Sequence, residues 1–297
     1  MAPSVRMPPM LYGTAWKGPR TSSLVVQAVL SGFKGIDTAC QPKHYSQSEV
    51  GDALAQLHEK HNIERGELWL QTKFTTIEGQ DSSKPLPYHR DAPLVEQVRQ
   101  SLVTSLNELN TTYLDALVLH SPMGTKKDHL AVWGQLEEFV EAGKVRQLGI
   151  SNIYDPVYLA WIFETSRIKP TIIQNRFCAE GLNYCLPILE LCAEHGAKFQ
   201  SFWTLTANPQ LLASPAIQSL AGLQSLSREA ALYKFLMTSS RFGTPGLIVP
   251  LNGTTDGEHM KEGVKVTQEV ESELAHGGKR VDERKRLERE LERMIWR

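Results

Sequence analysis

The sequence predicts an α/β protein with the (β/α)8 barrel fold, as a single domain over its 297 residues. Two observations favour this fold class: eight short runs rich in β-branched residues occur in order, and longer stretches with helical periodicity separate them. Chains of this length commonly form such a barrel around one core. We expect the barrel over about residues 10–262 and a C-terminal helix over about residues 281–297.

The expected strands are apolar runs bounded by glycine or polar residues. This pattern is typical of buried parallel strands. They span residues 10–15, 35–39, 68–74, 114–120, 145–152, 171–177, 198–203 and 246–253. The helices between them place apolar residues three and four positions apart, so each helix has one face that can pack on a strand. Examples are Val95, Val98, Leu102, Leu106 and Leu109, and Val132, Leu136, Phe139 and Val140.

The expected C-terminal helix is strongly amphipathic. Opposite charges spaced for i, i+4 pairing cover most of its surface, and one stripe is apolar, formed by Leu287, Leu291, Met294 and Ile295. This pattern favours a helix packed against the barrel. An interaction helix or a lid over the substrate is the alternative.

The composition argues against several classes of partner. The net charge of −1 provides no attraction for nucleic acid or for an anionic membrane. No apolar run is long enough to span a bilayer, and the first residues lack the apolar core of a signal peptide, so we expect a cytoplasmic protein. No paired C-x-x-C spacing indicates a disulfide framework or a metal site among the four cysteines, Cys40, Cys178, Cys185 and Cys192.

Polar side chains occur near the ends of the expected strands, where a barrel binds its ligands. Asp37 lies in the second run, Lys73 lies in the third and His120 closes the fourth. The next two runs contain hydroxyl and amide side chains, namely Ser151, Asn152, Gln174 and Asn175. Because strands of a parallel barrel consist mainly of Val, Ile and Leu, these residues together predict an active site.

The chain resembles the aldo-keto reductases in ordered stretches along about residues 10–262. The matching stretches are "GTAWKG", "GFKGIDTA" with "HYSQSEVGDAL", "ELWLQTKF", "TTYLDALVLHSP", "LEEFVEAGKVRQLGISN", "IIQNRF" and "IVPLNGTT". The resemblance implies a (β/α)8 barrel enzyme that reduces aldehydes and ketones, usually with NADPH, through a tetrad of Asp, Tyr, Lys and His.

On this sequence the resemblance identifies Asp37, Lys73 and His120 as three members of that tetrad. In many members the tyrosine lies five positions after the acid, where this chain has Pro42. Tyr45 is the only phenol in the segment and directly precedes "SQSEVGDAL". We therefore interpret the loop as three residues longer and Tyr45 as the general acid.

Carbonyl reduction requires this combination for physical reasons. Hydride addition to the carbonyl carbon leaves charge on the oxygen, which must then receive a proton. A phenol with its usual pKa of about 10 is a weak acid near neutral pH. A lysine ammonium lowers that pKa, and a carboxylate keeps the lysine charged. The expected order is Asp37, Lys73, Tyr45, with His120 donating a second hydrogen bond to the carbonyl oxygen.

The resemblance also implies contacts with the cofactor. Ser151, Asn152 and Gln174 correspond to residues that hold the nicotinamide carboxamide. An aromatic side chain, either Phe202 or Trp203, stacks on the nicotinamide ring. The expected cofactor-binding residues also include two from the first two strands, Thr14 and Asp37.

The phosphate end departs from the family pattern. Many members carry a Lys-Ser pair after the proline of the eighth strand and an arginine a few residues on, but this chain has Leu251 and Asn252 and no arginine there. The cations in this stretch are His259 and Lys261. Amide, hydroxyl and backbone N–H groups near the start of the next helix still offer phosphate contacts, from Asn252, Gly253, Thr254 and Thr255. NADPH is expected on the resemblance, and NADH stays open.

The substrate is expected to be a small carbonyl compound, aromatic or extended in shape, because four large side chains near the strand ends predict an apolar mouth: Trp16, Phe74, Met123 and Trp203. Two other functions stay open. One is a nucleotide-binding regulatory subunit, which the presence of all four tetrad residue types argues against. The other is a non-redox acid–base enzyme on the same barrel, such as a dehydratase or cyclase.

Overall fold

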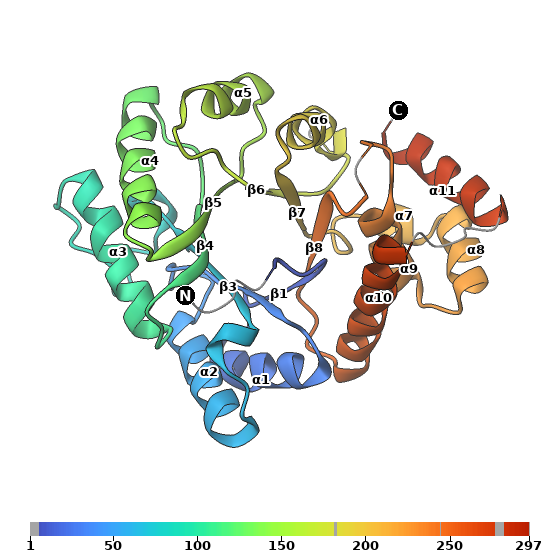
Figure 1. Ribbon diagram of the computed structural model, residues 1–297, viewed down its shortest axis with the longest axis horizontal. Helices are drawn as coiled ribbons and strands as arrows, with labels where there is room; N and C mark the ends of the chain where they lie inside the picture. Colours follow the sequence, from blue (N-terminus) through green and yellow to red (C-terminus); the bar gives the residue numbers. More distant parts are fainter. Residues whose placement is uncertain (1–5, 181–182, 244, 277–281, 297) are drawn as a thin grey trace.

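The computed structural model describes residues 6–180, 183–243, 245–276 and 282–296, and eight parallel strands in it close into a barrel in sequence order (Figure 1). Each strand lies inside one of the eight expected runs, so the predicted fold class is confirmed. The strands are Leu11–Gly13 (β1), Gly35–Asp37 (β2), Trp69–Phe74 (β3), Leu114–Leu119 (β4), Val145–Ser151 (β5), Ile172–Arg176 (β6), Lys198–Phe202 (β7) and Ile248–Asn252 (β8).

Helices surround the barrel (Figure 1). One α-helix follows each of the first six strands: Thr21–Ser31 (α1), Gln47–His61 (α2), Leu94–Glu108 (α3), Lys126–Glu141 (α4), Pro156–Thr165 (α5) and Leu186–His195 (α6). Five more described helices lie on the side of the molecule where Figure 1 shows β8: Pro209–Leu212 (α7), Pro215–Gln224 (α8), Arg228–Thr238 (α9), Gly257–His276 (α10) and Asp282–Ile295 (α11). Short 3-10 turns span Gly18–Arg20, Arg65–Glu67, Ile77–Gly79 and Asn183–Cys185.

Local chemistry fixes where several helices begin and end. The side chain of Thr125 accepts a hydrogen bond from the Asp128 amide at the start of α4, and Asp155 caps α5 in the same way ahead of Pro156. Helix α1 stops at Gly32, whose φ of 114° suits glycine alone among common residues. Thr125 and Asp155 thus lie in strand-to-helix connections, and Gly32 lies in the connection from α1 to β2.

The barrel interior consists of two chemically different layers. The lower layer is apolar and contains Leu11, Trp69, Ala116, Val118, Ile172 and Val249. Glycine is required at position 149 in this crowded interior, because a Cβ atom there would lie 2.8 Å from the Ile172 Cβ. The upper layer is polar, since the inward-facing positions of β3 continue from Trp69 to Gln71 and Lys73. This polar layer forms the floor of the site.

The C-terminal helix α11 contacts α8 on the outside of the molecule. Leu287, Leu291 and Ile295 are buried, whereas Met294 of the expected stripe is exposed. Trp296, which follows Ile295, is also buried, and its ring stacks on Phe235 with centroids 6.1 Å apart.

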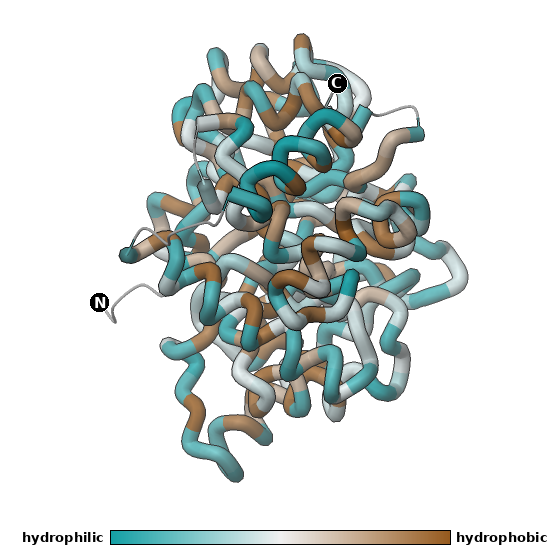
Figure 2. The backbone as a smooth tube through the Cα atoms, turned by 90° about the vertical axis from the view of Figure 1, so that its right-hand side faces the viewer, coloured by the Kyte–Doolittle hydropathy of each residue, from teal (hydrophilic) through white to brown (hydrophobic). Residues whose placement is uncertain are grey.

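In the described part of the chain no helix has the length and apolar character needed to cross a membrane. Figure 2 shows hydrophobic and hydrophilic residues alternating along the tube.

One histidine outside the barrel is buried without polar partners. His129 of α4 is 1% exposed and stacks on Trp133, with Tyr158 and Trp161 at the edges of its ring. Neither ring nitrogen has a hydrogen-bond partner among the described residues. Burial lowers the pKa of this imidazole to about 4. The folded protein therefore holds His129 neutral at a cost in stability.

Replacing His129 with Phe is expected to raise the free energy of unfolding by about 1 to 3 kcal/mol, because it removes buried polar atoms without partners. The unfolded chain takes up a proton near the usual pKa of about 6.5, so His129 costs stability as the pH falls from there toward about 4. Between pH 7 and pH 5, urea unfolding should therefore show a smaller loss of stability for His129→Phe than for the parent protein. The control is His61→Phe, at an exposed position on α2. A less stable His129→Phe variant at both pH values would contradict this account.

Candidate active site

A cavity of about 780 Å³ opens at the C-terminal ends of the strands. Asp37, Tyr45 and His120 line one part of it, and the segment that follows β8 lines another. This is the end of the barrel at which the polar residues were expected.

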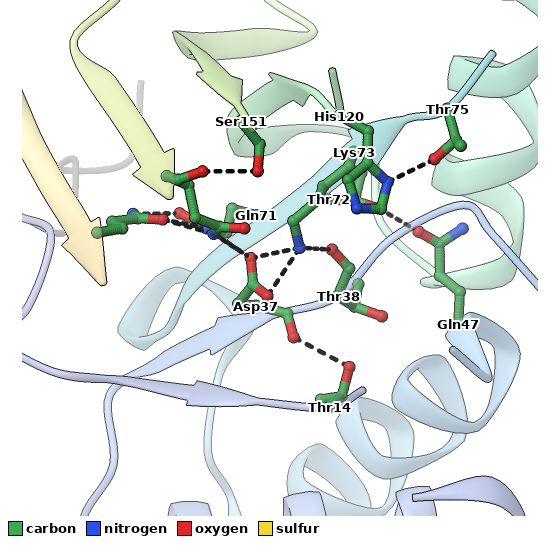
Figure 3. A network of polar contacts seen from close by, with 12 residues as sticks. Thr14, Asp37, Thr38, Gln47, Gln71, Thr72, Lys73, Thr75, His120 and Ser151 are labelled. Atoms are coloured by element: carbon green, nitrogen blue, oxygen red, sulfur yellow. Dashed lines mark hydrogen bonds and ion pairs between the residues drawn. The ribbon is translucent and has the colours of Figure 1, made fainter. Parts of the chain in front are cut away.

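The floor of the cavity contains a buried ion pair. The Nζ atom of Lys73 lies 2.7 Å from both carboxylate oxygens of Asp37 and 2.8 Å from the carbonyl oxygen of Thr38 (Figure 3). Both charged side chains are buried. Burial opposes the charge on Lys73, but the attraction of Asp37 and Tyr45 outweighs burial and raises the pKa of the lysine. The lysine therefore carries its charge at neutral pH.

Two glutamine side chains hold the carboxylate of this pair, and a third glutamine holds those two. The amide groups of Gln71 and Gln174 both donate to Oδ1 of Asp37, at 2.7 and 2.9 Å. The same two amides donate to Oε1 of Gln200, at 2.7 and 2.8 Å. Gln200 in turn donates to Oε1 of Gln71, which also accepts from the Trp69 indole. Sequence analysis missed Gln71 and Gln200, although amides inside apolar strand runs were a signal of a polar interior.

Tyr45 reaches the same floor from the loop after β2. Its ring centroid is 4.9 Å from the Lys73 Nζ atom and 6.2 Å from the centroid of His120. Burial raises the pKa of the phenol, and the charge of Lys73 offsets only part of that rise. The expectation of a pKa below the usual value is therefore wrong, because it omitted the desolvation of the phenol.

The long loop that carries Tyr45 is fixed by hydrogen bonds. The backbone N–H of Tyr45 donates to the Gln41 carbonyl, and Lys84 donates to the Pro42 carbonyl at 2.6 Å. Trp16, which follows β1, contacts this loop: its backbone N–H donates to the His44 carbonyl at 2.8 Å, and the centroids of the two rings lie 3.8 Å apart. In this loop Tyr45 lies beside Lys73.

His120 is oriented by its neighbours and is neutral. Its Nδ1 atom lies 2.6 Å from the Thr75 hydroxyl, and its carbonyl accepts a hydrogen bond from the Asn152 amide. Burial lowers the pKa of the imidazole to about 3, with further contributions from Lys73 and His44. Because Thr75 occupies Nδ1, Nε2 is the ring nitrogen available to a ligand.

The three residues expected at the nicotinamide carboxamide all line the cavity. The Ser151 hydroxyl donates to the backbone carbonyl of Gln174 at 2.7 Å, and Asn152 has a φ of 55°, in the left-handed region. The side-chain amide of Gln174 donates to Asp37 and to Gln200. Of this side chain, only the oxygen Oε1 can therefore face a ligand. Thr14 does not line the cavity; its hydroxyl donates to the Asp37 carbonyl from below.

Both candidate stacking aromatics line the cavity. Their rings are nearly perpendicular, with centroids 6.3 Å apart for Phe202 and Trp203. Trp203 is 48% exposed and has the guanidinium of Arg176 4.1 Å from its ring centroid. Either ring can therefore present a flat face to a ligand in the cavity.

The segment after β8 differs in part from the expectation. Asn252, Gly253 and Thr254 line the cavity, whereas Thr255 is exposed outside it. The side-chain oxygen of Asn252 accepts from the Thr254 amide at 3.0 Å, which shapes the turn. Of the two expected cations, His259 lines the cavity and Lys261 pairs with Glu258 on the surface.

A cation from the loop after β1 reaches this same segment. Lys17 is 8% exposed, lines the cavity and donates a hydrogen bond to the Gly253 carbonyl. Burial and the charge of Arg20 lower the pKa of Lys17. Sequence analysis missed this cation because it searched only the residues that follow β8. Strands β1 and β8 pair to close the barrel, which brings Lys17 there.

Two residues expected at the substrate mouth lie elsewhere. Trp16 lines the cavity and is 66% exposed. Phe74 is buried against Tyr88, because neighbouring residues on a strand face opposite sides and Lys73 faces the interior. Met123 lines a separate surface pocket beside Tyr158. The structure therefore does not bring Phe74 and Met123 into the cavity.

Comparison with known proteins agrees with this geometry. A profile of the Aldo/keto reductase family matches residues 16–273, which is most of the chain. The chain belongs to this family. Membership in the aldo-keto reductases supports carbonyl reduction with a nicotinamide cofactor as its general activity.

Named relatives are distant but extend over much of the aldo-keto reductase barrel. An NAD/NADP-dependent indole-3-acetaldehyde reductase of Schizosaccharomyces pombe is 26% identical over 88% of this chain and 86% of its own length. An uncharacterized oxidoreductase of the same organism is 28% identical over 62% of this chain, and the match spans 58% of that relative's length.

Solved structures share the fold at low sequence identity. An aldo-keto reductase from a Medee basin deep-sea metagenome library superposes with a TM-score of 0.73 at 19% identity, covering 97% of this chain and 92% of that one. A Bombyx mori aldo-keto reductase in complex with NADP gives a TM-score of 0.71 at 18% identity, with the same coverage of 97% and 92%.

Replacing Lys73 with Met is expected to lower the free energy of unfolding by about 3 to 5 kcal/mol, because it leaves the buried Asp37 carboxylate without its counter-charge. The double variant Asp37→Asn/Lys73→Met should recover part of this loss in urea unfolding. Lys261→Met is the control, because its ion pair with Glu258 is exposed to solvent and contributes little to stability. A Lys73→Met protein as stable as the parent would show that Asp37 does not depend on this lysine.

Proposed function

We propose that this protein is an NADPH-dependent reductase that converts an aldehyde or ketone to an alcohol, with Tyr45 as the general acid. The observation that carries the proposal is the convergence of one phenol, one ammonium–carboxylate pair and one neutral imidazole at the floor of one cavity. Each of these groups is held by hydrogen bonds or ring contacts from separate strands, which favours a prearranged site.

The cavity suits a nicotinamide dinucleotide. Ser151, Asn152 and the side-chain oxygen of Gln174 offer partners for a carboxamide. Phe202 or Trp203 offers a ring face for stacking. At the other end Lys17 supplies a cation beside Gly253, and α10 begins nearby at Gly257. When bound, such a cofactor supplies the hydride.

The residues of the chain supply the proton and the polarity. A raised pKa keeps the Tyr45 phenol protonated, so the proton is available for the carbonyl oxygen. Lys73 stabilises the phenolate that remains after transfer, and Asp37 with its glutamines holds Lys73 in place. Neutral His120 can donate from Nε2 to the same oxygen when Thr75 donates to its Nδ1.

The cavity also indicates the type of carbonyl compound. Trp16 contacts the His44 ring near Tyr45, and Trp203 is half exposed directly after β7. Flat aromatic faces favour an aromatic or extended carbonyl substrate.

Tyr45→Phe is expected to reduce kcat for aldehyde reduction by about a hundredfold or more, because it removes only the proton donor. The dissociation constant for NADPH should change little. Loss of nicotinamide absorbance measures the first quantity, and quenching of tryptophan fluorescence measures the second. Tyr113→Phe is the matched control, since Tyr113 lies between Arg65 and Arg146, away from the cavity. Full activity in Tyr45→Phe would mean that another group donates the proton.

The same assay separates the competing functions. Stoichiometric oxidation of NADPH with an aldehyde supports the reductase. Tight nucleotide binding with no turnover on any aldehyde would favour a regulatory subunit. Turnover without consumption of the cofactor would favour a dehydratase or cyclase.

Lys17→Met is expected to weaken NADPH binding about tenfold and NADH binding less, if its ammonium meets the additional phosphate of NADPH. Fluorescence titration of the variant with each nucleotide measures this difference. Lys261→Met is the control, because Lys261 is exposed and lies outside the cavity. An equal loss for the two nucleotides would place Lys17 at the diphosphate, which both share.

A further inference from the structure

Arg176 is a charged residue of the cavity that none of the proposed roles uses. It ends β6, is partly buried and lines the cavity two residues after Gln174. Among the described residues no carboxylate lies within ion-pairing distance of its guanidinium. Its Nε atom is buried, and no described residue accepts a hydrogen bond from it. A buried donor and a charge without a partner are both costly.

The structure nevertheless holds Arg176 in place. Its backbone N–H donates to the Tyr154 hydroxyl at 3.2 Å, and β6 pairs it with Phe202. Its guanidinium packs over the ring of Trp203, with 4.1 Å between the guanidinium carbon and the ring centroid. Trp203 itself has a φ of 57°. Stacking uses the flat face of the guanidinium and leaves the N–H donors around its edge free.

The acidic residues of the cavity do not neutralise this charge. Asp37 is paired with Lys73. Glu262 accepts from both the backbone and the hydroxyl of Ser227, at 2.8 and 2.6 Å. Glu229 lines the cavity without forming an ion pair to Arg176. The positive charge of Arg176 is therefore available to a ligand.

We propose that Arg176 binds an anionic oxygen group of the molecule that fills this cavity. The planar fork of arginine donors matches a carboxylate or a phosphate. Two sources share this chemistry: the diphosphate of the nicotinamide nucleotide and a carboxylate on the carbonyl substrate. The inference rests on the proposed function for the identity of the ligand, but the anion site itself can be tested separately.

The test compares Arg176→Met and Arg176→Lys with the parent. Isothermal calorimetry gives the dissociation constants of NADPH, NADH and benzoate, and initial rates give KM for benzaldehyde and 4-carboxybenzaldehyde. Arg241→Met is the matched control, because Arg241 is exposed, stacks on Phe242 and lies outside the cavity. Circular dichroism confirms that each variant is folded, and Arg176→Lys keeps the charge without the planar fork.

If the anion is the diphosphate, Arg176→Met weakens NADPH and NADH binding by at least tenfold and leaves both aldehyde KM values unchanged. If it is a substrate carboxylate, the KM for 4-carboxybenzaldehyde and the dissociation constant for benzoate rise at least tenfold, and the other constants stay the same. In both cases Arg176→Lys recovers only part of the loss.

Changes below twofold in every constant, relative to Arg241→Met, would overturn the proposal and leave Arg176 as a packing partner of Trp203. If the parent oxidises no NADPH with any aldehyde, the proposed function fails. The calorimetric titrations then test the anion site by themselves. If the parent binds benzoate and Arg176→Met does not, the anion site is supported. Absence of binding by benzoate and by both nucleotides in the parent would overturn it.

Discussion

The buried contact between Asp37 and Lys73 is the interaction on which the rest of the site depends. A closed parallel barrel has a dry interior, where an isolated charge is unstable. The protein places two opposite charges 2.7 Å apart there and adds hydrogen bonds from Gln71, Gln174 and the Thr38 carbonyl. Tyr45 and His120 then acquire their protonation states from this charged and desolvated floor, because burial and Lys73 both act on them.

The glutamines give this floor a fixed orientation. Gln200 accepts hydrogen bonds from both Gln71 and Gln174, so both amides must turn their N–H groups toward it and toward Asp37. Its own amide donates to Gln71 and to the sulfur of Met7, at the N-terminal side of the barrel. A flipped amide at any of the three would bring two acceptors together. The network therefore links the apolar lower layer of the barrel to the carboxylate of the site.

Much of this arrangement could be predicted from the sequence, because strands and strand ends have local signals. The eight runs located the strands, and single polar residues among apolar ones marked Asp37, Lys73 and His120. What the sequence did not reveal depends on contacts distant along the chain. Lys17 reaches Gly253 only because the barrel closes, and the raised pKa of Tyr45 comes from desolvation by the whole assembly. Phe74 lies outside the cavity because it neighbours Lys73 on β3 and so faces the opposite side of the strand.

The protonation states of the floor fit the proposed reduction. Reduction of a carbonyl consumes a proton, and oxidation of an alcohol requires a group that can accept one. Near neutral pH Tyr45 is protonated and His120 is neutral, since desolvation raises the pKa of the first and lowers that of the second. Lys73 stays charged, which lowers the cost of the transient phenolate without making the phenolate the resting form. The resting site therefore holds, on Tyr45, the proton that the proposed reduction needs.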